Sequence, residues 1–319
     1  MQMKRLKYYS NRIKWRLLMP FLRAKQFDTK RSIMIFSEPR GGSTWLMEIL
    51  AQLPNTASIF EPFHSHYGAL DAYTWGNHKN TSESWIEGKK AIHQILNADK
   101  LDSYQLERSP WYKYLQAENF VFKSVMGTPI MPWIIENFEF HFKPIYILRH
   151  PLSVASSTLE NLYMRGSTIN VDHKWEPTGY NKALYTKHQD LFAKDANPID
   201  TLIARWCINN HYALQQNEEW ITVHYEHMLI QPQQTLKDIF KEWSIEAPAE
   251  IQNNLDRPSH SDFKKDFRQD KNEQLYKWIK KYSKTELDHF QTILDRFEID
   301  IYKISDPYPQ VKQSKYHRA

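Results

Sequence analysis

Residues 32–50 read SIMIFSEPRGGSTWLMEIL. The first six residues form an apolar run of the length that suits a strand buried on both faces of a parallel sheet. A Pro-Arg-Gly-Gly turn ends this run, and from Ser43 to Leu53 the apolar residues recur with helical spacing. The stretch therefore predicts a strand, a glycine-containing turn and a helix whose first N–H groups can attract an anion.

The same alternation of short apolar runs and helical patterns continues along the chain. It predicts further strands at residues 57–60, 120–123, 144–149 and 220–225, and helices at 130–138, 152–162, 199–219 and 232–243. Such alternation is typical of an α/β fold with a mostly parallel sheet covered by helices on both faces. Residues 64–118 and 163–198 lack a clear period and are predicted as insertions that cap the sheet.

The length of 319 residues suits one large α/β domain, which we place at residues 32–305, between an arm (1–31) and a tail (306–319). With 41% hydrophobic and 25% charged residues, the chain is typical of a soluble globular protein. We expect neither a transmembrane helix nor a signal peptide, because no apolar run is long enough. Cys207 is the only cysteine, which excludes an intrachain disulfide and makes the cytoplasm the expected compartment.

The positive charge of the chain is concentrated in its arm. Residues 1–31 carry ten Lys or Arg and one acid, a net +9 that leaves −4 for the remainder of a chain whose total is +5. Aromatic and aliphatic residues are interspersed with these charges, so the arm suits contact with an anionic membrane surface. A solvated helix packed on the body is the alternative. Nucleic acid is not an expected partner, because no basic stripe continues into the body.

The turn after the first predicted strand carries groups that suit a phosphate. Arg40 adds a fixed charge with forked donors, and Ser43 and Thr44 add hydroxyl donors beside glycines that admit a close ligand. A Walker A loop would require a lysine after Gly42, and none is present. The turn predicts a phosphate site of another kind, with a purely structural turn as the alternative.

A second element of this type begins at Arg149, at the end of the strand predicted at 144–149. Ser157 lies about two turns into the helix that follows. Because both elements leave the sheet at its ligand-binding edge, we expect them to converge on a second phosphate. Two such sites on neighbouring turns imply a nucleotide with phosphates at both ends of its ribose. An isolated Arg149 would instead suit a structural ion pair.

Over residues 32–245 the chain resembles the sulfotransferases that use 3′-phosphoadenosine-5′-phosphosulfate (PAPS). The turn at 39–45 is similar to their 5′-phosphosulfate loop, Arg149 with Ser157 to their 3′-phosphate pair, and the Tyr-Glu pair beginning at Tyr225 to one found there in the family. The resemblance implies a P-loop-NTPase-like, three-layer α/β fold with five parallel strands. It also implies PAPS as donor, adenosine 3′,5′-bisphosphate as product, and no metal.

The resemblance further implies the cofactor-binding residues, which are Arg40, Gly41, Gly42, Ser43, Thr44, Trp45, Arg149, Ser157 and Tyr225. Among them, Trp45 would stack on the adenine or contact its edge, and Tyr225 is a second candidate for this role. Arg257 and the two residues after it are a looser match to a C-terminal cofactor contact.

One departure from the family pattern bears on the catalytic base. Small-molecule sulfotransferases have Lys-Thr-His after the third strand, whereas this chain has Lys123-Ser124-Val125 and no histidine there. Glu61-Pro62 is similar instead to the Glu-Pro of carbohydrate and bacterial sugar sulfotransferases, which implies Glu61 as general base.

Arg40 and Lys123 would then stabilise the leaving phosphate and the sulfuryl oxygens. A salt bridge to a basic neighbour is the alternative role of Glu61. His64 and His66 compete for the role of base, and their spacing also suits a metal, although no carboxylate pair supports one.

The predicted function is transfer of a sulfuryl group from PAPS to an acceptor hydroxyl, by in-line displacement, with a sugar or glycolipid as acceptor and the two insertions forming the acceptor side. The aromatic residues of the insertions suit sugar faces, and equally a capping core. Sulfation of a small-molecule or phenolic hydroxyl is an alternative. A P-loop-like kinase or nucleotide-binding module is another, but a kinase would need the missing loop lysine.

Overall fold

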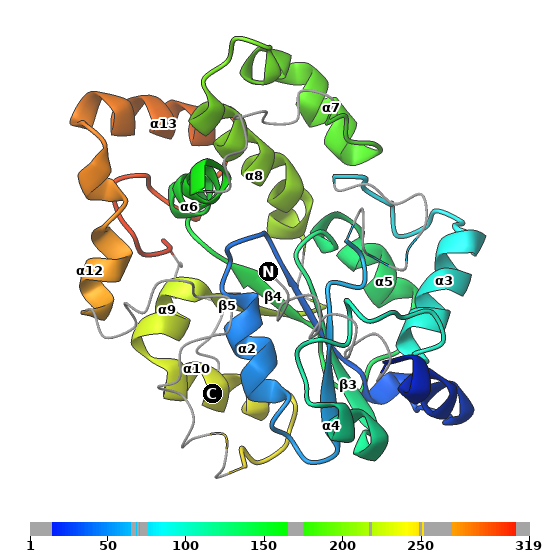
Figure 1. Cartoon of the computed structure of the whole chain (residues 1–319). Coiled ribbons are helices and arrows are strands. Elements are labelled where there is room, and N and C mark those ends of the chain that lie inside the picture. Colours follow the sequence, from blue (N-terminus) through cyan, green and yellow to red (C-terminus); the bar gives the residue numbers. More distant parts are fainter. Residues whose placement is uncertain are drawn as a thin grey trace, which may run out of the picture.

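A five-stranded parallel sheet lies at the centre of the computed structural model, which describes residues 15–64, 68, 70, 76–164, 175–216, 219–248, 251 and 270–310 (Figure 1). The strand order is β2-β3-β1-β4-β5, and all four pairings are parallel. The strands are β1 (Ile33–Ser37), β2 (Thr56–Phe60), β3 (Asn119–Ser124), β4 (Ile145–Leu148) and β5 (Ile221–His224). The predicted α/β fold with a five-stranded parallel sheet is confirmed.

The central strand β1 is buried along its whole length because it is covered from both sides. Met34 and Phe36 belong to one core and Ile33 and Ile35 to the other, since successive side chains of a strand point to opposite faces. Burial on both faces explains why this strand reads as an unbroken apolar run.

Helices on both faces complete three layers. The core that contains Ile33 and Ile35 includes α2 (Ser43–Leu50), α9 (Tyr225–Ile230) and α10 (Pro232–Glu242). The opposite core includes α3 (Ile86–Leu96), α4 (Trp111–Gln116), α5 (Met131–Asn137), α6 (Pro151–Met164), α8 (Pro198–Gln215) and α13 (Lys284–Arg296). Shorter elements are α7 (Tyr180–Lys187), α12 (Lys271–Tyr276), η1 (Thr29–Arg31), η2 (Thr128–Ile130), η3 (Gln189–Phe192) and η4 (Ile279–Lys281).

The C-terminal region contains structure that the sequence pattern did not predict. α13 begins with a capping box in which Ser283 and Glu286 satisfy each other's backbone N–H groups. Residues 306–310, assigned to the tail, fold back on the domain, where the Gln310 N–H donates to the Ile301 carbonyl over 2.7 Å.

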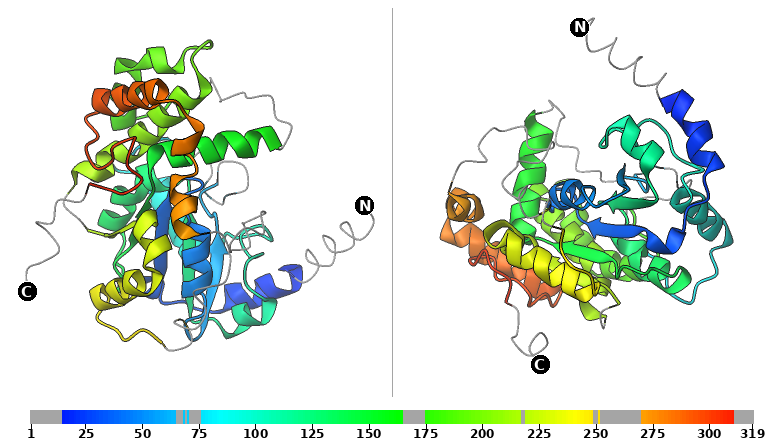
Figure 2. Two further views of the ribbon diagram at one scale, coloured as in Figure 1. Left: turned by 90° about the vertical axis from the view of Figure 1, so that its left-hand side faces the viewer. Right: turned by 90° about the horizontal axis from the view of Figure 1, so that it is seen from below.

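Within the described part of the N-terminal arm, residues 15–24 form a helix that packs on the body. Trp15, Leu18 and Leu22 are buried on one side of this helix. The Trp15 ring meets the ring of Tyr114 in α4 edge-on, with centroids 5.2 Å apart, and the two helices lie side by side (Figure 2). Residues 15–24 therefore form a helix that packs on the body, while contact of the arm with a membrane stays a prediction. None of the helices within the described residues has the length and apolarity needed to cross a bilayer.

The two predicted insertions meet each other. Asn77 and Thr178 form an isolated parallel bridge, and the Asn181 side chain donates to the Gly76 carbonyl over 3.1 Å. These contacts join the loop before α3 to the segment that leads into α7.

Candidate active site

The carboxyl ends of the strands meet at one edge of the sheet, and most of the predicted site residues lie there. The turn containing Arg40 follows β1, Glu61 follows β2, and Lys123 is near the end of β3. Arg149 follows β4, and Tyr225 follows β5. This edge is where open parallel sheets bind their ligands, because the strand-to-helix turns open there.

The turn between β1 and α2 depends on its two glycines. Gly42 is the N-cap of α2 with a φ of 89°, and a Cβ there would lie 2.4 Å from a ring carbon of Tyr225. A Cβ on Gly41 would lie 2.0 Å from the Ser37 hydroxyl oxygen. Because Gly42 has no side chain to cap the helix, the first N–H groups of α2 are available to a bound anion.

Hydrogen bonds join this turn to the segment that follows β4. The Arg40 Nε donates to the Ser157 hydroxyl oxygen over 3.0 Å, and the Arg149 Nη1 donates to the Arg40 carbonyl oxygen over 2.6 Å. The structure thus brings Arg40, Arg149 and Ser157 together, as expected from two elements at the same sheet edge.

Tyr225 lies between the two turns. The Arg149 guanidinium carbon is 4.0 Å from the centroid of the Tyr225 ring, a cation–π contact. The same ring lies directly against Gly42. Trp45, the other aromatic candidate for the adenine, is half-buried and packs against the core that contains Ile33.

Glu226 holds the backbone after β4 in place. Its carboxylate accepts the His150 N–H over 2.9 Å and the Tyr302 hydroxyl over 3.0 Å, and burial raises the pKa of Glu226. The His150 ring stacks on Trp278 at 4.2 Å, and burial lowers the pKa of His150 to about 3, so this ring is neutral at physiological pH. The sequence analysis did not identify His150, Trp278 or Tyr302, because their contacts join positions far apart in the chain.

Glu61 and Lys123 form a buried ion pair, with side chains 3% and 4% exposed. The second oxygen of Glu61 accepts the Val125 N–H over 2.9 Å. Burial lowers the pKa of Lys123, against the opposing effect of the Glu61 charge. The Lys123 ammonium also lies 4.6 Å from the centroid of the Phe60 ring. The salt bridge considered as the alternative role of Glu61 is therefore present.

The competing histidines are only partly described. The His64 N–H donates to the Glu61 carbonyl over 3.2 Å, so His64 is at the same turn, and its ring lies 6.0 Å from that of Tyr104. His66 and Arg257 lie outside the described residues. Within the described part of the chain, no three His, Cys, Asp or Glu side chains gather as a metal site would require.

Another buried carboxylate, Glu38, was missed by the sequence analysis. Its Oε2 accepts from the Asn209 side chain over 3.4 Å, while Oε1 has no partner among the described atoms. Burial raises the pKa of Glu38 to about 8. This acid lies two positions before Arg40, and its environment comes from α8, which local sequence does not reveal.

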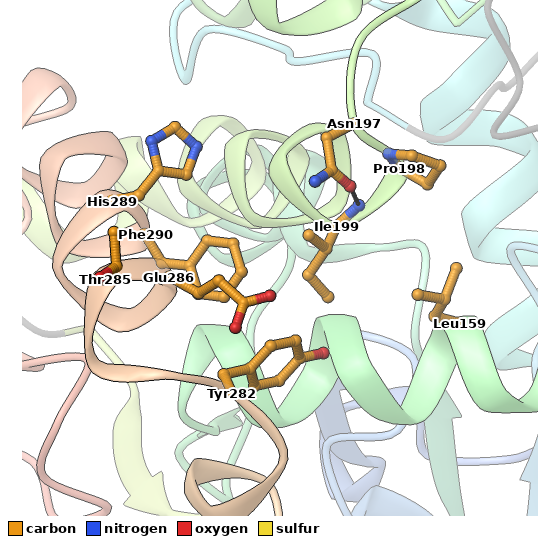
Figure 3. Close-up of a pocket in the computed structure, with 9 residues that line it drawn as sticks. All are labelled: Leu159, Asn197, Pro198, Ile199, Tyr282, Thr285, Glu286, His289 and Phe290. Atoms are coloured by element: carbon orange, nitrogen blue, oxygen red, sulfur yellow. Dashed lines mark hydrogen bonds between the residues drawn. The ribbon is translucent and has the colours of Figure 1, made fainter.

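Two cavities in the described part of the chain are lined by none of the predicted site residues. One, of about 580 Å³, lies between α3 and the bridged loop at Asn77 and Thr178; its lining includes Lys79, Trp85, Lys90, Gln94 and Lys100. The other, of about 370 Å³, lies between α6, α8 and α13 and contains none of the predicted site residues (Figure 3). Tyr282 in its wall lies within hydrogen-bond distance, 3.0 Å, of Ser156 on α6.

Most of the chain matches a known protein family. A family model described as "Sulfotransferase family" matches residues 32–248. The sulfotransferase domain of the Synechococcus PCC 7002 olefin synthase is similar at 19% identity and a TM-score of 0.47, over 87% of this chain and 99% of that one.

A mouse sulfotransferase complexed with PAP is similar at 14% identity and a TM-score of 0.43, over 88% of this chain and 89% of that one. Sulfotransferase STF9 of Mycobacterium avium is similar at 15% identity and a TM-score of 0.40, over 88% of this chain and 79% of that one. No curated protein matches the chain.

Proposed function

The chain belongs to the sulfotransferase family, and we propose that it transfers a sulfuryl group from PAPS to a hydroxyl of a carbohydrate or glycolipid. The observation that carries this proposal is the junction of Arg40, Arg149 and Ser157 at the carboxyl edge of the sheet. Two arginines from separate strand-to-helix turns suit a ligand with two separated anionic groups.

The residues at this edge fit such a cofactor. The turn at Gly42 has no side chain between the start of α2 and a ligand, so backbone N–H groups can hold the 5′-phosphosulfate. The Arg149 Nε is buried and has no hydrogen-bond partner among the described residues, which leaves a donor for the 3′-phosphate. The Tyr225 ring under Arg149 would support the nucleoside. Bound PAPS supplies an activated sulfuryl group on its 5′-phosphate.

Glu61 would accept the proton of the acceptor hydroxyl. In the structure one of its oxygens is held by Lys123 and the other by the Val125 N–H, which fixes the carboxylate in one orientation. We propose that Lys123 turns from Glu61 toward the sulfuryl oxygens when the donor binds, which frees Oε1 as base. A positioned base contributes about 10²- to 10⁴-fold to the rate, and the lysine and Arg40 would stabilise the charge that develops on the leaving phosphate.

The cavity beside α3 supports a carbohydrate acceptor. Both insertions contribute to its lining, and its polar groups include Asn77, Gln94 and Thr178 next to the Trp85 ring. Lys79, Lys90 and Lys100 outnumber Glu87, the acid in the same lining, although Lys79 is paired with Glu83. Polar groups beside an aromatic ring, with a net positive charge, suit a sugar with acidic substituents.

The test is transfer of labelled sulfuryl groups from PAPS to a panel of neutral glycans, acidic glycans, glycolipids and phenols. The proposal predicts sulfated carbohydrate products and no requirement for a divalent metal. Labelling of phenols alone would overturn the carbohydrate acceptor, and turnover of ATP with Mg²⁺ but not of PAPS would overturn the donor.

A further inference from the structure

Exposed apolar side chains gather on two helices. Of the eight large hydrophobic residues that the described part of the chain leaves exposed, five lie on the N-terminal helix (residues 15–24) or on α4. They are Leu17, Phe21, Trp111, Tyr112 and Leu115, between 37% and 67% exposed, and together we call them the apolar surface. Such clustering is unusual, because exposed apolar residues are ordinarily scattered singly.

The two helices are fixed to each other, so this surface is part of the fold. Trp15 packs edge-on against Tyr114, and the Lys25 ammonium donates to the Leu115 carbonyl and, over 3.1 Å, to the Ala117 carbonyl. The buried side of the N-terminal helix faces the core, which leaves Leu17 on the outside with Phe21, one turn further on.

The two helices that carry the apolar surface are basic: within the described residues they contain Arg16, Arg23 and Lys113 and no acid. Residues 1–27 contain eight Lys or Arg and no acid, and α4 contains Lys113 and no acid. Trp and Tyr side chains, such as Trp111 and Tyr112, are enriched where a protein meets the headgroup layer, because each ring is apolar with one polar group. A surface with apolar side chains, interfacial aromatics and cations suits an anionic bilayer.

We propose that the apolar surface docks the protein on anionic membranes, with its side chains among the headgroups and the basic residues of the N-terminal helix near the lipid phosphates. The docking surface lies away from the active site. Lys113 of α4 donates over 2.6 Å to the carbonyl of Ala51, just beyond the end of α2. Since α2 begins at the Gly42 turn and runs about 12 Å from it, the docking surface contacts the end of α2 that is remote from this turn.

The experiment is flotation of the full chain with vesicles of phosphatidylcholine, with and without phosphatidylglycerol, at low and high salt. We expect binding to the phosphatidylglycerol vesicles that weakens with salt. The double variants Leu17→Ser/Phe21→Ser and Trp111→Ser/Leu115→Ser should each bind at least about tenfold more weakly, because each removes two large apolar side chains from the contact.

Ile86→Ser is the matched control, because Ile86 is 74% exposed but lies outside the apolar surface, and it should bind as wild type does. Equal binding to both vesicle types, or wild-type binding by both double variants, would overturn the proposal. So would a dimer in sedimentation that the double variants abolish, since the surface would then bind a second copy. Vesicle binding requires no PAPS, so it is tested independently of sulfuryl transfer.

Discussion

The Arg149 side chain donates a 2.6 Å hydrogen bond to the carbonyl oxygen of Arg40, across 109 positions of sequence. This bond joins the turn after β1 to the turn after β4. A second hydrogen bond, from the Arg40 side chain to the Ser157 hydroxyl in α6, links the same two segments. Because both guanidinium groups come from strand-to-helix turns at one sheet edge, a ligand that binds one also approaches the other.

Arg149→Ala should weaken the binding of adenosine 3′,5′-bisphosphate about 10- to 100-fold, because it removes charge-assisted hydrogen bonds to the 3′-phosphate. Titration calorimetry measures the change. Arg296→Ala is the control, since Arg296 pairs with the exposed Asp190 elsewhere in the fold and should leave the affinity unchanged. An unchanged dissociation constant in Arg149→Ala would remove this arginine from the cofactor site.

Gly42→Ala should destabilise the turn by about 1–3 kcal/mol, because an alanine would be held at a φ of 89° and its Cβ would collide with Tyr225. Chemical denaturation measures the loss. Adding Tyr225→Ala should relieve the collision but not the backbone strain, so the double variant should recover part of the loss attributed to Gly42→Ala. A single variant as stable as wild type would contradict this account of the turn.

Glu61→Gln should retain affinity for adenosine 3′,5′-bisphosphate and lose about 10²- to 10⁴-fold in kcat, because an amide cannot accept the hydroxyl proton. His64→Gln is the matched comparison and should keep most of the activity. The reverse result, an active Glu61→Gln enzyme and an inactive His64→Gln enzyme, would assign the base to His64 and leave Glu61 as the partner of Lys123.

Stability should depend on pH through Glu38, whose pKa is raised by burial from 4.5 to about 8. Between these values the folded state holds a proton that the unfolded state has lost, so the contribution of Glu38 to stability is full below about pH 4.5 and declines up to about pH 8. Glu38→Gln mimics the protonated acid and removes this dependence. The free energy of unfolding of the variant relative to wild type should therefore rise between these pH values, and a constant difference would contradict a buried, protonated Glu38.

The sequence predicted those parts of the fold that depend on local patterns. β1 is predictable because burial on both faces requires an unbroken apolar run. The turn at Gly42 is predictable from its glycine, which its close contact with the Tyr225 ring requires. The protonated Glu38 is not predictable in this way, because α8 supplies its surroundings through Asn209. Similarly, His150 is fixed by Trp278, a contact across 128 positions of sequence that no local pattern reveals.

The candidate site shows the same division. Convergence of Arg40 and Arg149 follows from the rule that parallel strands share a carboxyl edge. The pairing of Glu61 with Lys123 required knowing that β2 lies beside β3, where Phe60 and Lys123 are in register. Sequence alone offered only a salt bridge of Glu61 to an unspecified basic neighbour, as an alternative to a catalytic base.

The most direct measurement is a crystal structure of the protein with adenosine 3′,5′-bisphosphate. Our account predicts the 5′-phosphate at the N–H groups that follow Gly42, beside Arg40, and the 3′-phosphate at Arg149 and Ser157. A nucleotide bound elsewhere, or one whose 3′-phosphate lies away from Arg149, would contradict it.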